Sequence, residues 1–265
     1  MNSDTTHRAM PKAAGPDDLR RSLELLKLPF ILDHVEDFAR QAGAEQWSHM
    51  EFLVRLIEGE AALHQERACQ RRVTQARFPV LKTFEQFDFT WPTKINRLAV
   101  QNLFRLKFIE DKANAILIGG VGLGKTHLAI ALGLAACRLG KRVRFFTAAT
   151  LVNRLEETQK QYQLERFLKQ LDKLDLLVCD ELGYLSFNRS GAELLFQVFA
   201  DRYERSSLLI TSNLPFSEWQ QVFQGERMTA ALLDRLTHHC EIFEMNGESY
   251  RFRESMKQKR TTKGK

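Results

Sequence analysis

Two patterns of apolar residues follow one another along the chain and change near Pro79. Before Pro79, apolar residues recur every three or four positions, which is typical of amphipathic helices that share a small core. This pattern predicts a small all-helical domain over residues 17–78, and the polar residues 1–16 are expected to be disordered. Three helices are expected, beginning at Asp17, after Pro29 and at Ser48, with the last two ending near Gly43 and Ala76.

After Pro79, an aromatic segment (KTFEQFDFTWP) and a helix around Leu98 lead into a different pattern. Short, uninterrupted apolar runs now alternate with helical stretches, which predicts a buried parallel sheet with helices on both faces. The fold class is therefore α/β over residues 79–253, followed by a basic tail over 254–265. Strands are expected over 115–120, 142–146, 174–181, 207–213 and 240–245, and helices up to 139 and over 153–173, 192–205 and 228–238.

A glycine-rich loop follows the first of these strands. It fits the pattern GxxxxGK[ST] between an apolar strand and an amphipathic helix, as a phosphate-binding loop does. Its glycines let backbone N–H groups surround phosphate oxygens, and the helix N-terminus adds a favourable dipole. Lys125 is expected to reach the β- and γ-phosphates of ATP, and Thr126 to bind Mg²⁺. The residues assigned to ATP binding here are Gly119, Gly120, Val121, Gly122, Leu123, Gly124, Lys125, Thr126 and His127.

Polar residues also end the third and fourth expected strands. The run LLVCDE ends in Asp180 and Glu181, which is typical of a Walker B element when it follows a phosphate loop. Asp180 is expected to hold Mg²⁺ through water, and Glu181 to polarise the attacking water. At the end of the run LLITSN, we assign Asn213 to contact with the γ-phosphate or that water. Glu181 argues against a P-loop kinase of small molecules, which needs no water-activating base there.

Composition and charge narrow the class of protein. No apolar run approaches the roughly 18 residues of a transmembrane helix, and the amino-terminal residues lack the apolar region of a secretory signal. The four cysteines lie far apart, which argues against a disulfide scaffold and fits a reducing cytoplasm. The net charge is +6, and the residues from Arg251 onward carry this excess. Such a tail either contacts nucleic acid or is simply solvated.

The order of these motifs resembles that of the AAA+ ATPases. The segments KTFEQFDF, GGVGLGKTHLA, LLVCDELGYL, LLITSN, LLDRL and GESYRFR are similar to those of the helicase loader DnaC and, more closely, of the IstB helper ATPases of insertion sequences. The likeness extends from about Leu19 to Arg253. It implies a P-loop AAA+ sheet between layers of helices, ATP and Mg²⁺ as cofactors, and no separate lid domain, because 14 residues follow Arg251.

The resemblance also implies roles for two arginines. Arg235, in LLDRL, matches the arginine finger that reaches the γ-phosphate held by a neighbouring subunit. Arg251, in SYR, matches an arginine that contacts the nucleotide of its own subunit. Rival candidates for the finger on nearby predicted helices are Arg202, Arg205 and Arg227. Candidates for contact with adenine, which are more simply read as core residues, are Phe84, Phe87 and Phe89.

The resemblance implies that ATP-bound subunits assemble into an oligomer on duplex DNA. This assembly is expected in the cytoplasm and does not involve a membrane. This oligomer would help a transposase select its target and insert DNA. Phosphate contacts require Lys or Arg and carry no sequence information. The first candidates for DNA contact are Arg154, Lys160, Arg166 and Lys169, and the rivals are Arg71, Arg72, Arg77 and the tail. The alternative function is loading of a replicative helicase, with the helical domain docking the helicase.

Overall fold

The computed structural model describes residues 15–90, 95–247 and 249–250. The expected basic tail, 254–265, lies outside these ranges, and so does the expected disordered start apart from Gly15 and Pro16. Within the described ranges, no helix combines the length and the apolar character that crossing a membrane requires.

Contacts divide the chain into two units, Met1–Ala68 and Cys69–Lys265, so the division falls inside helix α3 (His49–Ala76). The last turns of α3 belong to the second unit, because Ala76 is buried in its core and Nε of Arg72 donates to the carbonyl oxygen of Cys137 at 2.9 Å. This contact gives Arg72 a structural role, and its rival role in DNA contact stays a prediction. The domain boundary at residue 78 stays a prediction.

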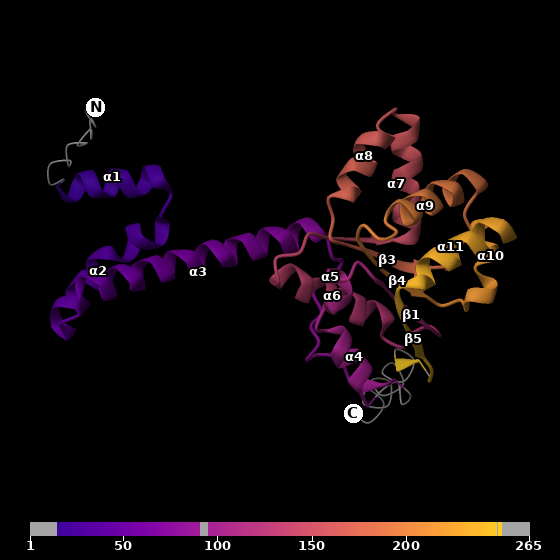
Figure 1. Cartoon of the computed structure of the whole chain (residues 1–265), viewed down its shortest axis with the longest axis horizontal. Helices are drawn as coiled ribbons and strands as arrows, with labels where there is room; N and C mark the ends of the chain where they lie inside the picture. Colours follow the sequence, from indigo (N-terminus) through magenta and orange to yellow (C-terminus); the bar gives the residue numbers. More distant parts are fainter. Residues whose placement is uncertain (1–14, 91–94, 248, 251–265) are drawn as a thin grey trace, which may run out of the picture. The chain divides into compact units, whose positions relative to one another are not determined.

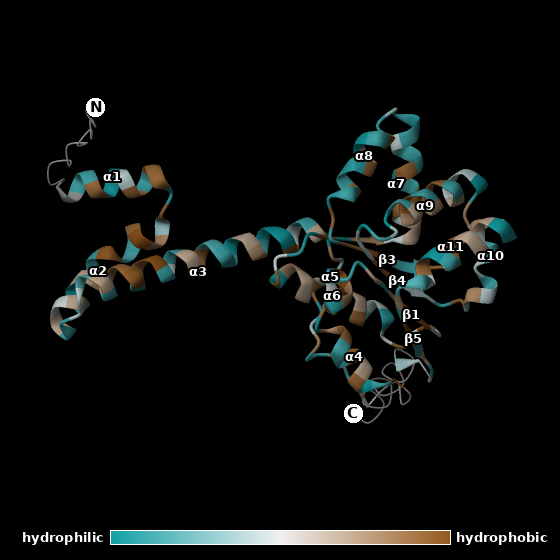
Figure 2. Cartoon of the chain, viewed as in Figure 1, coloured by the Kyte–Doolittle hydropathy of each residue, from teal (hydrophilic) through white to brown (hydrophobic). Residues whose placement is uncertain are grey.

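Three helices form the described part of the first unit, from residue 15 onward, as the apolar spacing predicts (Figure 1). They are α1 (Pro16–Leu26), α2 (Pro29–Glu45) and the first part of α3, and each contributes one residue to a small core made of Leu23, Ile31 and Leu56. Figure 2 shows the apolar residues on α2 and on the adjoining part of α3.

Side chains satisfy backbone groups at the starts of α2 and α3. The buried carboxylate of Glu60 accepts a hydrogen bond from the N–H of Ile31 at 3.0 Å, within the first turn of α2. The Ser48 hydroxyl accepts one from the N–H of Glu51 at 3.1 Å. Because the first N–H groups of a helix have no partner within the helix, these contacts fix where both helices begin.

Five parallel strands form the sheet of the second unit, in the order β2-β3-β4-β1-β5 (Figure 1). This arrangement confirms the expected α/β fold. The strands are β1 (Asn114–Gly119), β2 (Val143–Thr147), β3 (Leu176–Leu182), β4 (Ser207–Ser212) and β5 (Cys240–Met245). The helices are α4 (Arg97–Leu103), α5 (Lys107–Glu110), α6 (Lys125–Arg138), α7 (Ala148–Lys160), α8 (Leu164–Asp172), α9 (Arg189–Asp201), α10 (Gln220–Phe223) and α11 (Glu226–His238), with a short 3-10 helix, η1 (Phe216–Glu218).

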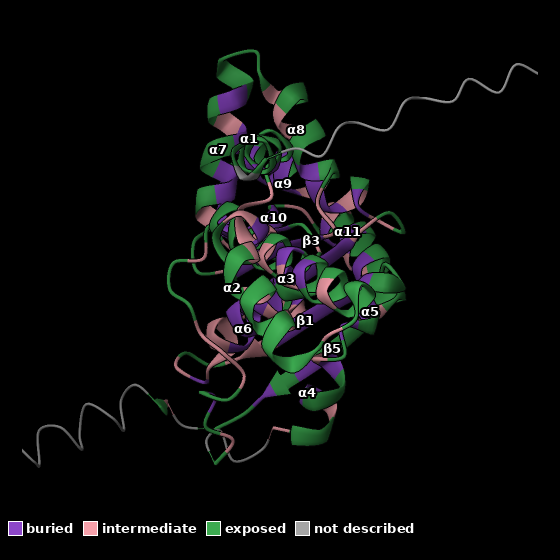
Figure 3. Ribbon diagram, turned by 90° about the vertical axis from the view of Figure 1, so that its left-hand side faces the viewer, coloured by how far each residue is buried: buried purple, intermediate pink, exposed green. Residues whose placement is uncertain are grey.

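Apolar side chains pack on both faces of this sheet. Leu117 of β1 and Val178 of β3 enter one core with α4, α5 and α6. Ile116 and Leu177, their neighbours in sequence, enter the other core with α7, α9, α10 and α11. Successive residues of a strand point to opposite faces, so burial on both faces explains the uninterrupted apolar runs. Figure 3 shows β1 and β3 buried among helices with exposed outer surfaces.

The segment after β2 forms two helices where the sequence predicts one over 153–173. Tyr162 has a φ of 58°, in the left-handed region, and the chain turns there between α7 and α8. Each helix buries its own apolar face, with Leu155 on α7 and Leu171 on α8. The prediction was wrong because the apolar spacing continues across a turn that contains no Gly or Pro.

Arg202, at the end of α9, is 2% exposed and joins three parts of the second unit. Its guanidinium donates to the carbonyl oxygens of Leu171 at 2.8 Å, Leu174 at 3.1 Å and Ser207 at 3.2 Å. Burial lowers the pKa of Arg202 to about 10. A guanidinium held inside the fold cannot reach a neighbouring subunit, so Arg202 is excluded as a rival arginine finger.

A close contact in the first unit provides a test of its packing. A Cβ at Gly59 of α3 would overlap the ring of Phe30, and that ring is stacked on His34 at 4.4 Å between centroids. Gly59→Ala should therefore destabilise the unit by about 1–2 kcal/mol, despite the gain of roughly 1 kcal/mol in helix propensity. The control is Gly43→Ala, where a Cβ meets nothing within 4 Å and a small gain is expected. Amide hydrogen exchange of α2 and α3 measures the stability of both variants. Equal stability of Gly59→Ala and Gly43→Ala would contradict the close packing of Phe30 on Gly59.

Candidate nucleotide-binding site

The carboxyl ends of β1, β3 and β4 meet at one edge of the sheet, beside a pocket of about 680 Å³. Because β4 lies between β1 and β3, three strands that carry sequence motifs are neighbours. Ligands of open α/β sheets bind at this edge. The sequence-assigned residues that line the pocket are Val121, Gly122, Leu123, Gly124, Lys125, Thr126, His127, Glu181 and Asn213.

Two glycines of the phosphate loop permit close contact with the end of β5 and with the segment that follows it. Gly119 has a φ of 155°, and a Cβ there would overlap the carbonyl oxygen of Met245. Gly122 has a φ of 80°, and a Cβ there would overlap the side chain of Ser249. Glycine alone combines such angles with so little space. The carbonyl oxygen of Gly122 also accepts a hydrogen bond from the N–H of Tyr250 at 3.0 Å, and Tyr250 lines the pocket.

Lys125 is the first residue of α6, and its ammonium group contacts the loop. Nζ donates to the carbonyl oxygens of Gly119 at 2.6 Å and Gly120 at 2.7 Å. These contacts hold the positive charge where the loop meets the N-terminus of α6. An anion in the loop can therefore interact with the ammonium group, with backbone N–H groups and with the helix dipole together.

Asp180, near the end of β3, is a carboxylate with 2% exposure held by two threonine hydroxyls. Oγ1 of Thr126 lies 3.0 Å from both carboxylate oxygens, and Oγ1 of Thr211 on β4 donates to Oδ1 at 2.6 Å. Burial raises the pKa of Asp180, and the hydrogen bonds from Thr211 and Thr126 oppose that shift. Through these hydrogen bonds, the carboxylate of Asp180 connects α6, β3 and β4.

Thr211 also positions Glu181, a role that the sequence analysis missed. Its hydroxyl oxygen accepts a hydrogen bond from the N–H of Glu181 at 2.9 Å. Glu181 has a φ of 60°, which costs a non-glycine residue about 1–2 kcal/mol, and the β3–β4 register shifts between Cys179 and Leu182. This irregularity leaves the side chain of Glu181 exposed at the pocket. The signal in the sequence is the polar ending of LLITSN, from which the sequence analysis assigns Asn213 but not Thr211.

Asn213, just after β4, lines the same pocket. Its Oδ1 is buried and has no hydrogen-bond partner among the residues that the structure describes. Since an unsatisfied buried oxygen is costly, a donor from a bound molecule or water would stabilise it. The nearby oxygen atoms of Thr126 and Asp180 are of the kind that Mg²⁺ prefers, so these residues fit a hydrated Mg²⁺ ion.

The segment before α4 forms another wall of the pocket. Phe87 lines the pocket while being only 8% exposed, and its ring centroid lies 5.4 Å from that of His127. Nε2 of His127 lies 2.9 Å from the carbonyl oxygen of Thr83, which fastens this segment to α6. Phe84 and Phe89 pack against the core. Of the three aromatic candidates for contact with adenine, Phe87 is therefore the one that lines the pocket.

Arg235 lies apart from the pocket. It is exposed on the last turn of α11, with its guanidinium carbon 5.8 Å from the ring centroid of Phe196. Among the described residues, the pocket lining does not include it. Arg251 lies outside the described residues, one position beyond Tyr250. Arg235 is thus accessible to another molecule.

The four basic residues assigned to DNA contact lie on α7 and α8, at one end of the second unit (Figure 1). All are exposed: Arg154, Lys160, Arg166 and Lys169. Two of them pair with acids of their own helix, Arg154 with Glu157 at 2.6 Å and Lys169 with Glu165 at 2.6 Å. Exposed pairs of this kind contribute about 0–1 kcal/mol, so they can be exchanged for contacts with phosphate.

Known proteins resemble this chain over most of its length. Residues 21–258 match the family model of IstB-like ATP-binding proteins. The ATP-binding protein of insertion sequence IS21 from Pseudomonas aeruginosa is 40% identical over 91% of this chain and 91% of its own length. That of IS5376 from Geobacillus stearothermophilus is 38% identical over 90% of this chain and 95% of its own.

A solved structure shares the fold. The replication initiator DnaA, bound to AMPPCP and single-stranded DNA, has a TM-score of 0.52 and 24% identity, and the match covers 66% of this chain and 54% of that one. This likeness agrees with the AAA+ fold that the motif order predicts. The resemblance to the ATPases of insertion sequences is confirmed by the family match, and the chain belongs to the family of IstB-like ATP-binding proteins.

Proposed function

We propose that this protein hydrolyses ATP, oligomerises on duplex DNA in an ATP-dependent way, and helps a transposase select its target and insert DNA. The observation that carries hydrolysis is the pocket where the phosphate loop, the Asp180–Thr211 pair and Glu181 meet. Family membership, together with relatives that are named as ATP-binding proteins of insertion sequences, supports a role in transposition.

The loop binds the triphosphate in this proposal. Backbone N–H groups of the loop and the N-terminus of α6 hold the phosphates, and Lys125 exchanges its contacts with two loop carbonyls for phosphate oxygens. Thr126 and Asp180 hold Mg²⁺, which when bound neutralises charge on the phosphate oxygens. Phe87 and His127 then border the rest of the nucleotide.

Glu181 and Asn213 act on the attacking water. The carboxylate of Glu181 accepts a proton from this water, and the amide of Asn213 orients the water or the γ-phosphate. Thr211 keeps both acids in place, because it donates to Asp180 and accepts from the backbone of Glu181. Glu181 therefore keeps its strained backbone and its direction toward the pocket.

Arg235 completes the site of a neighbouring subunit. An arginine finger supplied in trans accelerates hydrolysis by about 10³–10⁵-fold, so ATP turnover would depend on assembly. The exposed position of Arg235 outside its own pocket supports this role. Arg251 is proposed to contact the nucleotide of its own subunit, as the family resemblance implies.

DNA contact is proposed along α7 and α8, where the exposed cations Arg154, Lys160, Arg166 and Lys169 lie. Cations that contact phosphate give affinity without sequence readout. This property suits a protein that offers many target sites to a transposase. Hydrolysis would then release the DNA and reset the assembly.

Glu181→Gln should bind ATP and assemble on DNA but hydrolyse ATP at least 100-fold more slowly, because the variant lacks the general base. The result should be a long-lived complex with labelled duplex DNA, measured by its dissociation rate after dilution. The matched control is Lys125→Ala, which should lose both ATP binding and assembly. Release of DNA by Glu181→Gln at the wild-type rate would refute the role of hydrolysis in release.

Thr211→Val should keep the shape of the side chain but remove both hydrogen bonds of its hydroxyl. The hydroxyl stabilises the charged form of Asp180, so its loss raises the pKa of Asp180 further. The acid limb of the ATPase pH profile should move to higher pH, and more Mg²⁺ should be needed. Thr211→Ser should restore the wild-type pH profile and the wild-type Mg²⁺ requirement. If the valine variant keeps the wild-type pH profile, Thr211 is not a positioning residue.

Replacing Arg154, Lys160, Arg166 and Lys169 with alanine should weaken DNA binding and flatten its dependence on salt. Each lost phosphate contact lowers the slope of log K against log salt by about 0.9 on duplex DNA. A charge-matched control replaces four other exposed cations: Arg20, Arg40, Arg105 and Lys107. Equal salt slopes for the two quadruple variants would move the DNA site away from α7 and α8.

A further inference from the structure

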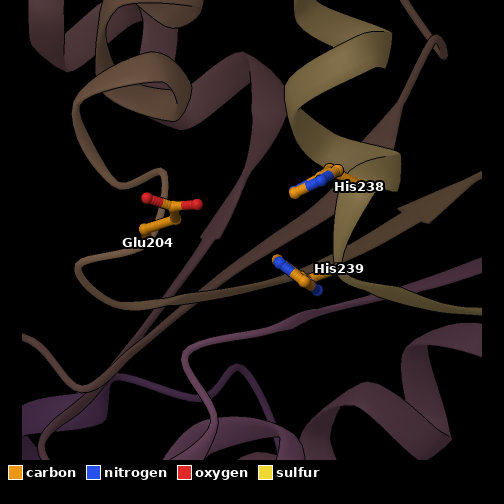
Figure 4. Close-up of side chains that lie close together, drawn as sticks. All are labelled: Glu204, His238 and His239. Carbon is orange, nitrogen blue, oxygen red and sulfur yellow. The ribbon is translucent and has the colours of Figure 1, made fainter.

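Three side chains with metal-ligating groups meet at the other edge of the sheet, where β4 and β5 begin (Figure 4). Glu204 belongs to the turn between α9 and β4, His238 is the last residue of α11, and His239 leads into β5. One ligand atom from each lies within 4.8 Å of the other two. Figure 4 shows the carboxylate of Glu204 facing the two imidazole rings.

The hydroxyl group of a tyrosine contacts one histidine of this cluster. Oη of Tyr203 lies 2.9 Å from Nδ1 of His238. Burial and the adjacent carboxylate of Glu204 raise the pKa of Tyr203. When Nδ1 of His238 carries the proton and donates it to this oxygen, Nε2 keeps its lone pair for a metal ion. Histidine ligands of metal ions are oriented in the same way by a partner on their other ring nitrogen.

We propose that Glu204, His238 and His239 bind one divalent transition-metal ion of the zinc type, with water completing its coordination. Two imidazoles and one carboxylate are a ligand set suited to Zn²⁺ and related ions, whereas Mg²⁺ and Ca²⁺ prefer oxygen ligands alone. Metal–ligand distances of about 2.0–2.2 Å require the ligand atoms to move closer together by roughly 1 Å. All three residues are exposed, so side-chain rotation allows this movement.

The bound ion would connect elements that are separate in sequence. Glu204 precedes β4, whereas both histidines lie at the junction of α11 and β5. The rings of His238 and His239 are already close, with centroids 4.2 Å apart and planes at 64°. An ion held here would restrain the end of α11, which also carries Arg235 one turn earlier.

The test is a titration of the full chain with Zn²⁺, and with Co²⁺ as a spectroscopic probe, in excess Mg²⁺ so that the nucleotide pocket does not take up the probe. One ion per chain is expected, with the absorption of Co²⁺ bound by nitrogen and oxygen. His239→Ala and Glu204→Gln should each weaken binding at least 10-fold. His49→Ala, an exposed histidine at the start of α3, is the control and should bind as the wild type does.

Tyr203→Phe distinguishes a metal site from a chance cluster, because it removes no ligand. Loss of a partner that orients a ligand weakens metal binding by about 10–100-fold. Circular dichroism and ATP binding establish that each variant is folded. No binding by the wild type, or an affinity unchanged in His239→Ala and Glu204→Gln, would overturn the proposal. Neither result bears on the ATPase site at the opposite edge.

Discussion

The buried carboxylate of Asp180 is the constraint on which the nucleotide pocket depends. A charge with 2% exposure is costly unless hydrogen bonds hold it, and here they come from Thr126 on α6 and Thr211 on β4. Those two hydroxyls reach one carboxylate only because β4 lies between β1 and β3. The strand order therefore determines which side chains meet at the pocket. The same Thr211 hydroxyl also holds Glu181 at the break in β-sheet register.

Features encoded in contiguous residues could be predicted from the sequence. The phosphate loop, the acid pair Asp180–Glu181 and the alternation of strands and helices are local patterns, and the structure has the loop and the strands where these patterns predict them. The helices of the small first unit could also be predicted, because Pro29 and the capping pair at Ser48 mark the residues where two of them begin. In each case the residue type and its spacing are enough to define the element.

Features that depend on pairing between distant segments could not be predicted. The role of Thr211 follows from its position beside Asp180 across the sheet, which its own sequence does not reveal. Arg202 resembled a surface arginine until its contacts with the carbonyl oxygens of Leu171 and Ser207 showed it to be buried. The turn at Tyr162 was hidden because two amphipathic helices happen to continue one spacing. Each of these three features becomes visible only when the three-dimensional positions of the residues are known.

The groups proposed to act within one chain lie apart from those proposed to act on a neighbouring subunit or on DNA. One pocket is lined by residues of the phosphate loop, Glu181 and Asn213, whereas Arg235 and the cations of α7 and α8 are exposed elsewhere on the same unit. The most direct measurement is binding to fluorescent duplex and single-stranded DNA, each with ATP plus Mg²⁺ and with ADP plus Mg²⁺. The account predicts cooperative binding to duplex DNA that requires ATP. Preference for single strands, or binding that is the same with both nucleotides, would contradict it and favour the loading of a helicase.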